Sequence, residues 1–296
     1  MRQRVPSGRG RGLTPDLALL AVVLAVLAAA VLAFTAGSAP AARGKAFDAQ
    51  QAYALLKEQV ELGPRPAGSA ASRQLAQRLR TLLPNGRFQA VPGGLRNVVG
   101  VIPGRNPKRI VVVGAHYDTK DIPGFVGAND GASGTAVAVQ LARTIRNREL
   151  RPTVVFVLFD GEEAPAGVPD SQFERYGLRG SKVAASAFRK AESMILLDFV
   201  GDKELTIPRE WFSNRRLWAK LRAAAARTGN AAVFPPRTSG GVLDDHTPFQ
   251  RRGVPAIDLI DFDFACWHEQ CDNLSAVSPQ SLEASGETVL ELLRSL

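Results

Sequence analysis

Two adjacent glutamates, Glu162 and Glu163, are the residues most suited to chemistry. They follow Phe156-Val-Leu-Phe159, an aromatic and β-branched run that predicts a buried parallel strand. In an open α/β sheet, ligands bind just beyond the carboxyl ends of the strands. Adjacent carboxylates repel each other unless a cation or a proton separates their roles. The pair therefore suits one metal-binding glutamate and one that moves protons, although a lone Glu-Glu after a strand is more often a solvated acidic turn.

His116 and Asp118 follow another strongly apolar run, 109–114. A histidine at a strand end can be a packing residue, but a carboxylate two residues on suits a metal-bound imidazole oriented by an acid behind it. The glycine-rich loop 124–134 then carries Asp130. This loop lacks the Gly-Lys-Ser/Thr of a phosphate loop and the spacing of a dinucleotide-binding motif. We expect its glycines to turn the chain and aim Asp130 at His116.

Later strand and loop ends add more groups of this kind. They are Asp198 in an apolar run, Asp244-Asp245-His246 in a polar loop, and Trp267-His268 in an aromatic loop. The ligand-type residues are then His116, Asp130, Glu163, Asp198 and His268. Two histidines and three carboxylates form a mixed nitrogen and oxygen set that suits Zn²⁺. The same set is expected where one aspartate bridges two metal ions.

The elements that must position these groups alternate between strands and helices. Strands are expected within 88–102 as two runs, and over 109–114, 153–159, 193–200 and 254–260. Helices are expected over 47–61, 70–83, 135–145, 181–190, 211–228 and 282–296, with a loop over 164–180 at the rim of a pocket. This alternation predicts an α/β fold whose mostly parallel or mixed sheet is covered on both faces.

Composition limits the class of protein. With 296 residues, 45% of them hydrophobic and 22% charged, the chain is long enough for one large α/β domain. The net charge of +9 is partly due to a basic start. The remainder has no run of Lys and Arg and no basic patch interleaved with aromatic residues, so we expect no nucleic-acid partner.

The N-terminal segment is expected to lie outside the fold. Residues 1–16 form a basic tail, 17–37 an apolar segment without charge, and 38–45 a linker. The apolar segment is long enough to span a bilayer and longer than the core of a cleavable signal. Arginines before it predict a cytoplasmic tail and an extracytoplasmic domain over 46–296. If the segment is cleaved instead, the domain is secreted.

The chain has two cysteines, Cys266 and Cys271, which flank His268. In an extracytoplasmic compartment they can form a disulfide across this short loop. A Cys-x-x-Cys metal site is absent from the sequence. We favour a disulfide that braces the loop over two free thiols.

Together these motifs resemble the zinc aminopeptidase and glutaminyl cyclase superfamily. The resemblance rests on Gly114-Ala-His116-Tyr-Asp118, the Asp130 loop, Asp160-Gly-Glu162-Glu163, Leu197-Asp198 and Trp267-His268. It covers residues 46–296 and implies a single domain with a mixed, mainly parallel central sheet flanked by helices.

Several stretches resemble glutaminyl-peptide cyclotransferases in particular. They are Met194–Gly201, Gly240–Phe249, Arg251–Pro255 and Trp267-His268. Asp244 matters most, because aminopeptidases usually have serine there. The resemblance implies one zinc ion held by Asp130, Glu163 and His268, and catalysis by Glu162, Asp198 and Asp244. It further implies a pocket walled by Trp267, Phe264 and Val242, with Asp118 supporting the metal ligands.

Two alternatives remain open. In a two-zinc aminopeptidase, Asp130 would bridge the ions and His116 and Asp198 would complete a second site. In a protein of another class, the domain would only bind a ligand outside the cytoplasm. The run Asn129–Gly134 is closer to the aminopeptidases, and the shorter aromatic loop leaves Phe262 as an alternative to Phe264.

Overall fold

The computed structural model describes residues 46–296, which belong to one compact unit. The predicted tail, membrane anchor and linker over 1–16, 17–37 and 38–45 lie outside the described residues. Within the described part, no helix combines the length and apolarity needed to cross a membrane.

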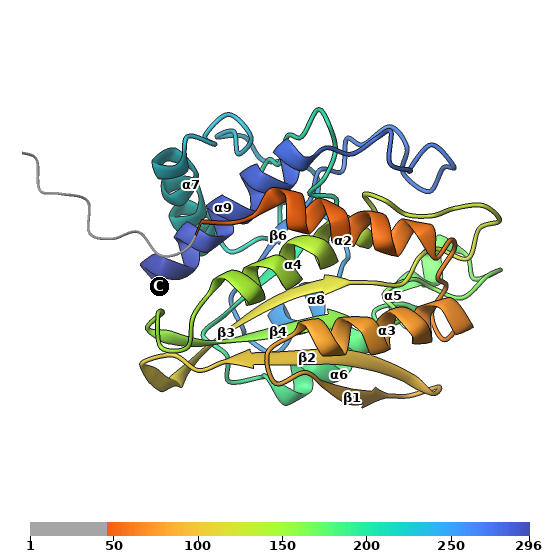
Figure 1. The fold of residues 1–296 in the computed structure, drawn as a ribbon, viewed down its shortest axis with the longest axis horizontal. Coiled ribbons are helices and arrows are strands. Elements are labelled where there is room, and N and C mark those ends of the chain that lie inside the picture. Colours follow the sequence, from red (N-terminus) through yellow and green to blue (C-terminus); the bar gives the residue numbers. More distant parts are fainter. Residues whose placement is uncertain (1–45) are drawn as a thin grey trace, which may run out of the picture. The chain divides into compact units, whose positions relative to one another are not determined.

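The described residues form a six-stranded sheet flanked by helices (Figure 1). The strands are β1 Arg87–Val91, β2 Leu95–Ile102, β3 Asn106–His116, β4 Pro152–Phe159, β5 Ser193–Leu197 and β6 Ala256–Leu259. The helices are α2 Ala49–Glu61, α3 Ala70–Leu82, α4 Ala132–Thr144, α5 Phe173–Tyr176, α6 Arg179–Ala187, α7 Arg215–Thr228, α8 Thr247–Gln250 and α9 Pro279–Ser295, with a 3₁₀ turn η1 over Asp170–Gln172. These elements confirm the predicted mixed α/β domain.

The strand order is β1-β2-β4-β3-β5-β6. Strands β4, β3, β5 and β6 pair in parallel, whereas β2 pairs antiparallel with both β1 and β4. Since parallel strands end at the same edge, the segments after β3, β4, β5 and β6 all emerge together. Ligand sites of open α/β sheets form at such an edge.

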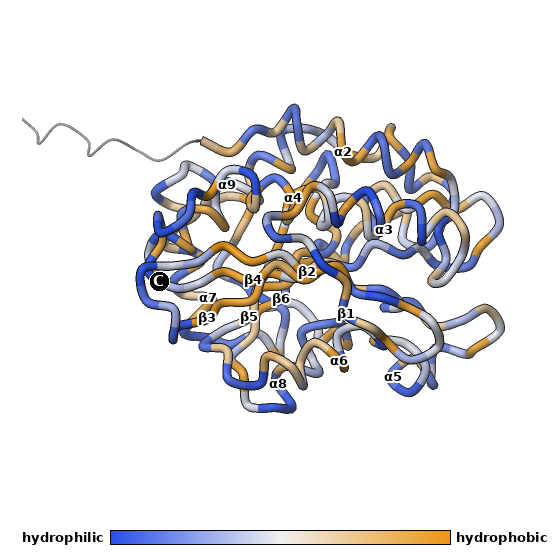
Figure 2. The backbone as a smooth tube through the Cα atoms, turned by 60° about the horizontal axis from the view of Figure 1, so that its bottom comes forward, coloured by the Kyte–Doolittle hydropathy of each residue, from blue (hydrophilic) through white to orange (hydrophobic). Residues whose placement is uncertain are grey.

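Alternate residues of each strand face two hydrophobic clusters. On one face, Val113 and Phe156 pack in a cluster with residues of α2, α3, α4, α7 and α9. On the other face, Val112 and Val157 pack with residues of α6 and α8. Figure 2 shows the central strands as the mainly apolar part of the backbone trace. A sheet covered on both faces holds its strand ends in a fixed arrangement.

Helix α7 begins four residues later than the sequence predicts. The Asn214 side chain accepts hydrogen bonds from the amides of Arg216 and Leu217 and so caps the helix at that point. The residues before it form a turn instead, in which Glu210 accepts from the amides of Phe212 and Ser213. Capping by a short polar side chain competes with helix extension, so the prediction of a helix from residue 211 is wrong.

Candidate metal centre and active site

His116, the last residue of β3, faces two carboxylates. Its Nε2 lies 3.2 Å from Asp130 Oδ1 and 3.3 Å from Asp198 Oδ1. Its Nδ1 lies 3.1 Å from the backbone carbonyl of Asp118 and donates to it, which leaves Nε2 directed at the carboxylates. Burial lowers the pKa of His116, but the surrounding aspartates outweigh this effect and raise it well above its ordinary value.

The loop before α4 brings Asp130 to His116, as the glycine-rich sequence predicts. Gly131 has φ +85°, and a Cβ there would lie 2.7 Å from the carbonyl oxygen of Asp118. A side chain at this position would therefore be strained and would clash with the backbone. This glycine lets the two loops approach closely enough to place Asp130 beside His116.

His268 and Glu163 meet on the other side of Asp130. His268 Nε2 lies 3.1 Å from Glu163 Oε1 and 3.5 Å from Asp130 Oδ2. Lys120 Nζ lies 3.0 Å from the other oxygen of Glu163. Burial would raise the pKa of Glu163, but His268 and Lys120 together lower it. His268 has φ +57°, a sparsely populated conformation that is common at functional sites.

Asp118 orders the segment after β4. Its two carboxylate oxygens accept hydrogen bonds from the amides of Glu162 and Glu163, each at 3.2 Å. Asp118 Oδ1 also lies 3.8 Å from His116 Nδ1. The aspartate predicted to support the metal ligands therefore lies behind His116 and fixes the backbone of both glutamates.

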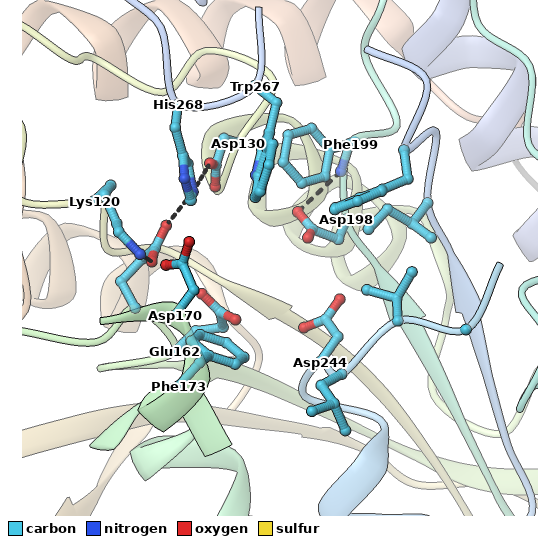
Figure 3. Close-up of a pocket in the computed structure, with 16 residues that line it drawn as sticks. Lys120, Asp130, Glu162, Asp170, Phe173, Asp198, Phe199, Asp244, Trp267 and His268 are labelled. Carbon is cyan, nitrogen blue, oxygen red and sulfur yellow. Dashed lines mark hydrogen bonds and ion pairs between the residues drawn. The ribbon is translucent and has the colours of Figure 1, made fainter. Parts of the chain in front are cut away.

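Glu162, Asp198 and Asp244 point into one cavity of about 350 Å³ (Figure 3). Burial, followed by the charge of Glu163, raises the pKa of Glu162 well above its ordinary value. Burial and the charge of Asp198 do the same for Asp244. A carboxyl group with a raised pKa can both accept and return a proton near neutral pH.

The residues that line the cavity include two of the three expected in the pocket wall. Val242 and Trp267 line it, but Phe264 does not, and Phe262 takes its place. Phe264 instead packs behind the wall against Phe199 and Ile260. The order of residues in an aromatic loop gives no sign of which ring turns inward, which is why sequence alone left both candidates.

Sequence analysis did not single out several residues that line the cavity. They include Lys120, Asp170, Phe173, Phe199 and Ile260. Asp170 and Phe173 come from the loop 164–180, which was expected at the pocket rim. Lys120 lies four residues beyond His116, and that proximity was the available signal for it.

Two charged residues away from the cavity hold the ligand loops together. Asp272 Oδ1 and Oδ2 accept hydrogen bonds from the amides of Asn129 and Asp130, at 2.7 and 3.0 Å. The fully buried Arg65 donates to the carbonyls of Val126 and Gly127 in the same loop. Neither residue belongs to a recognisable motif, and sequence analysis missed both.

The disulfide predicted between Cys266 and Cys271 is present. It closes the loop that carries His268, directly before Asp272. The histidine and the carboxylate that fixes the Asp130 loop are thus tied to one short, cross-linked segment.

A second histidine cluster lies deeper in the domain. His246 Nδ1 lies 3.5 Å from Asp258 Oδ2, and its Nε2 lies 3.6 Å from Glu210 Oε2. All three residues are fully buried, and neither ring nitrogen forms a hydrogen bond within the described residues. Burial lowers the pKa of His246 to about 4.

The residues around Asp130 fit a divalent metal ion. The groups His116, Asp130, Asp198 and Asp130, Glu163, His268 each bring three ligand atoms within 4.8 Å of one another. Asp130 Oδ2 is buried and finds no hydrogen-bond partner among the described residues, an arrangement that a cation would satisfy. The nitrogen and carboxylate donors suit zinc.

Known proteins resemble this chain in both sequence and fold. The chain is 30% identical to the glutaminyl-peptide cyclotransferase of Bos taurus, over 72% of each chain. A glutaminyl cyclase structure from an Acidobacteriales bacterium matches with a TM-score of 0.75 and 29% identity, covering 88% of this chain and 98% of that one. The structure of a Zn-dependent exopeptidase from Parabacteroides distasonis matches with a TM-score of 0.76 and 28% identity, covering 86% of this chain and 100% of that one.

The family comparison agrees with these matches. The model of peptidase family M28 matches residues 97–293, which include all the ligand-type residues described above. The chain therefore belongs to peptidase family M28.

Proposed function

We propose that this enzyme is a zinc-dependent glutaminyl-peptide cyclotransferase, which converts an N-terminal glutamine to pyroglutamate and releases ammonia. The observation that carries the proposal is the convergence of Glu162, Asp198 and Asp244 on one cavity beside a metal-type cluster. An aminopeptidase needs a base for water but has no evident use for the buried acid Asp244. The similarity to named glutaminyl cyclases supports the same conclusion.

Asp130, Glu163 and His268 would hold the zinc ion, because their ligand atoms converge at the inner end of the cavity. When bound, zinc acts as a Lewis acid that polarises the γ-carbonyl group of the substrate glutamine. Lys120 neutralises the second oxygen of Glu163, and Asp118 keeps the Glu163 backbone in place.

Glu162 moves the proton. It takes a proton from the α-amino group as the bond forms between that nitrogen and the γ-carbonyl carbon. It then gives the proton to the amide nitrogen, and ammonia leaves as the carbon–nitrogen bond breaks. The raised pKa of Glu162 matches this task, since one group must act first as base and then as acid.

Asp198 and Asp244 assist from the opposite wall. The charge of Asp244 acts on Glu162, and burial together with the charge of Asp198 raises the pKa of Asp244. When it is protonated, a carboxyl group in this position can donate a hydrogen bond to the substrate amide. Trp267 and Val242 cover the cavity with apolar surface and exclude water.

One observation favours a second candidate, a two-zinc aminopeptidase. The two oxygens of Asp130 face different histidines, Oδ1 toward His116 and Oδ2 toward His268. A carboxylate in this position can bridge two ions. His116 and Asp198 would then complete the second site, and Glu162 would take the proton from the attacking water.

A product assay separates the two enzymes. The zinc-loaded protein is incubated separately with Gln-Leu and Leu-Leu, and the products are identified by mass. Cyclisation predicts a Gln-Leu product lighter by one ammonia, with Leu-Leu unchanged. Free leucine from Leu-Leu would show an aminopeptidase instead, and conversion of neither dipeptide would favour a domain that only binds.

We also propose that residues 17–37 anchor the enzyme in a membrane, with the domain 46–296 outside the cytoplasm and acting on peptide or protein N-termini. The Cys266–Cys271 disulfide supports an oxidising compartment. Membrane fractionation with protease added to intact cells tests this placement. Protection of the domain would contradict it, and release into the medium would indicate cleavage and secretion.

A further inference from the structure

Six large apolar side chains are exposed among the described residues. Those with more than a third of their surface exposed are Tyr176, Trp211, Phe212, Leu243, Phe262 and Trp267. Single exposed apolar residues are normal, but a contiguous group marks an interaction site. Every one of them lies on a segment that lines or touches the cavity.

The contacts with the cavity wall are direct. Leu243, Phe262 and Trp267 line the cavity itself. The Phe262 and Trp267 rings pack with their centroids 5.1 Å apart. Tyr176 is on the same short helix as the cavity residue Phe173. The apolar surface therefore continues outward from the pocket.

The segment with Trp211 and Phe212 is fastened to the cavity wall. The Phe212 ring covers Gly241, a residue of the wall, where a Cβ would come within 2.4 Å of the ring. Trp211 donates its amide hydrogen to the carbonyl of Gly240. Trp211 is nevertheless 60% exposed and Phe212 55% exposed, so their outer surfaces face solvent.

Glu210 makes this region a preorganised unit. It is fully buried, and its Oε1 accepts hydrogen bonds from the amides of Phe212, at 2.8 Å, and Val242, at 3.1 Å. Its Oε2 accepts from Ser213 at 2.7 Å. One buried carboxylate thus joins the exposed aromatic segment to the cavity-wall loop, and a surface held in this way loses little entropy when it binds.

We propose that Trp211, Phe212, Leu243 and Phe262 form a subsite for apolar and aromatic side chains that directly follow the N-terminal residue of a peptide substrate. The inference rests on the proposed function, because that residue must occupy the cavity. An extended chain advances about 3.3–3.6 Å per residue, so the second and third residues can reach this rim. Aromatic rings there would bind apolar side chains by burying their surface.

The test compares two peptides on the full-length, zinc-loaded protein. Gln-Phe-Phe-amide should be cyclised with a higher kcat/KM than Gln-Gly-Gly-amide. The Trp211→Ala and Phe212→Ala variants should lose about threefold to tenfold in kcat/KM for the aromatic peptide, through KM, and remain unchanged for the glycine peptide. Asn147→Ala, an exposed change beyond α4, is the control and should change neither.

Equal kcat/KM for the two peptides would overturn the subsite and leave the cyclase assignment intact. Variants in which kcat/KM falls by the same factor for both peptides would do the same. If glutamine is not cyclised, the proposed function fails. The same variants are then compared on Leu-Phe-Phe-amide and Leu-Gly-Gly-amide.

Calorimetric titration of the Glu162→Gln variant with the glutamine peptides gives a readout without turnover. If the Glu162→Gln variant binds the aromatic peptide more tightly than the glycine peptide, and adding Phe212→Ala removes this difference, the subsite is supported. Equal binding of the two peptides overturns it. If the protein binds phosphatidylcholine vesicles through Trp211 and Phe212 but binds the two peptides equally, the surface would be assigned to lipid instead.

Discussion

The domain contains two buried clusters of histidine and carboxylate that differ in access. The pocket cluster, here His116, Asp130, Glu163, Asp198 and His268, opens on the cavity through Asp130, Glu163, Asp198 and His268. The sealed cluster, here Glu210, His246 and Asp258, is fully buried, and none of its members lines the cavity. Both have residue types that bind metals, so residue type alone does not separate a reactive site from a structural one.

The pKa values of the histidines in the two clusters shift in opposite directions. Carboxylates 3.2–3.3 Å from Nε2 raise the pKa of the buried His116. In the sealed cluster the carboxylates lie 3.5–3.6 Å from His246 and form no hydrogen bond with it, so burial dominates and lowers its pKa to about 4. At His116 the surrounding aspartates outweigh burial, whereas at His246 burial alone shifts the pKa.

Asp244 connects the two clusters. It lines the cavity, and its ligand oxygen also lies within 4.8 Å of His246 and Asp258. Burial and then Asp244 raise the pKa of Asp258 well above its ordinary value. The sealed cluster lies behind the cavity wall, whereas the pocket cluster brings together three carboxylates that suit a cation.

The largest expected effect is on turnover. Glu162→Gln should reduce kcat by about 10²–10⁴-fold, because the amide cannot carry the proton, while zinc content stays the same. The matched control is Glu163→Gln, which should instead lose zinc. Rates measured with metal analysis test both, and retained turnover in Glu162→Gln would contradict the proton-carrying role.

A smaller effect is expected on metal affinity. Asp272→Asn should weaken zinc binding by about 10–100-fold, because Asp272 fixes the amides of Asn129 and Asp130 behind the ligands. Competition with a fluorescent chelator measures the change. Asp263→Asn, at an exposed position, is the control. Unchanged affinity in Asp272→Asn would show that the loop holds its position without it.

Removal of the disulfide should act on stability. Replacing both Cys266 and Cys271 with serine releases a short loop, for which chain entropy predicts a loss of about 2 kcal/mol. The free energy of unfolding in urea, measured without metal, tests this value. A matched measurement of zinc affinity shows whether His268 also moves, and an unchanged unfolding free energy would contradict the bracing role.

The smallest effect concerns pH. Burial raises the pKa of Asp245 and Asp272 to about 7, above their value of about 3.9 in an unfolded chain. The folded state then binds more protons, so this stabilisation is full below pH 4 and is lost as pH rises to about 7. The pKa of His246 is lowered instead, so its contribution to stability is full above pH 6.5 and is lost as pH falls to about 4.

Melting temperatures of the metal-free protein between pH 4 and 8 measure this balance. Asp245→Asn should reduce the fall in melting temperature between pH 4 and 8 by about 2–4 °C. Since Asp245 is not a proposed metal ligand, the Asp245→Asn variant should bind zinc with the same affinity as the wild type. A decline as steep as in the wild type would show that Asp245 does not contribute to the pH dependence.

The sequence predicted what depends on local pattern. Apolar runs predicted β3 and β4. The side chains that follow these strands lie at one edge of the sheet because parallel strands end together. The contact between Asp130 and His116 followed from a glycine turn. By contrast, Arg65 and Asp272 act through backbone atoms of distant loops, which no local pattern encodes.

The remaining differences arise from competition between local and tertiary effects. Trp211 fits a helical pattern, but the Asn214 cap and buried Glu210 hold it in an exposed turn. Phe262 and Phe264 are the same residue type and both rings contact Phe199, but Phe264 is buried in a cluster with Ile260 whereas Phe262 lines the cavity. Side-chain direction in loops depends on such contacts and cannot be obtained from spacing.

We expect zinc to bind the pocket cluster and not the sealed cluster. Anomalous diffraction at the zinc edge, on crystals of the zinc-loaded protein, distinguishes the two sites. A peak bounded by Asp130, Glu163 and His268 is expected. A peak among Asp244, His246 and Asp258, with none beside Glu163, would contradict this expectation.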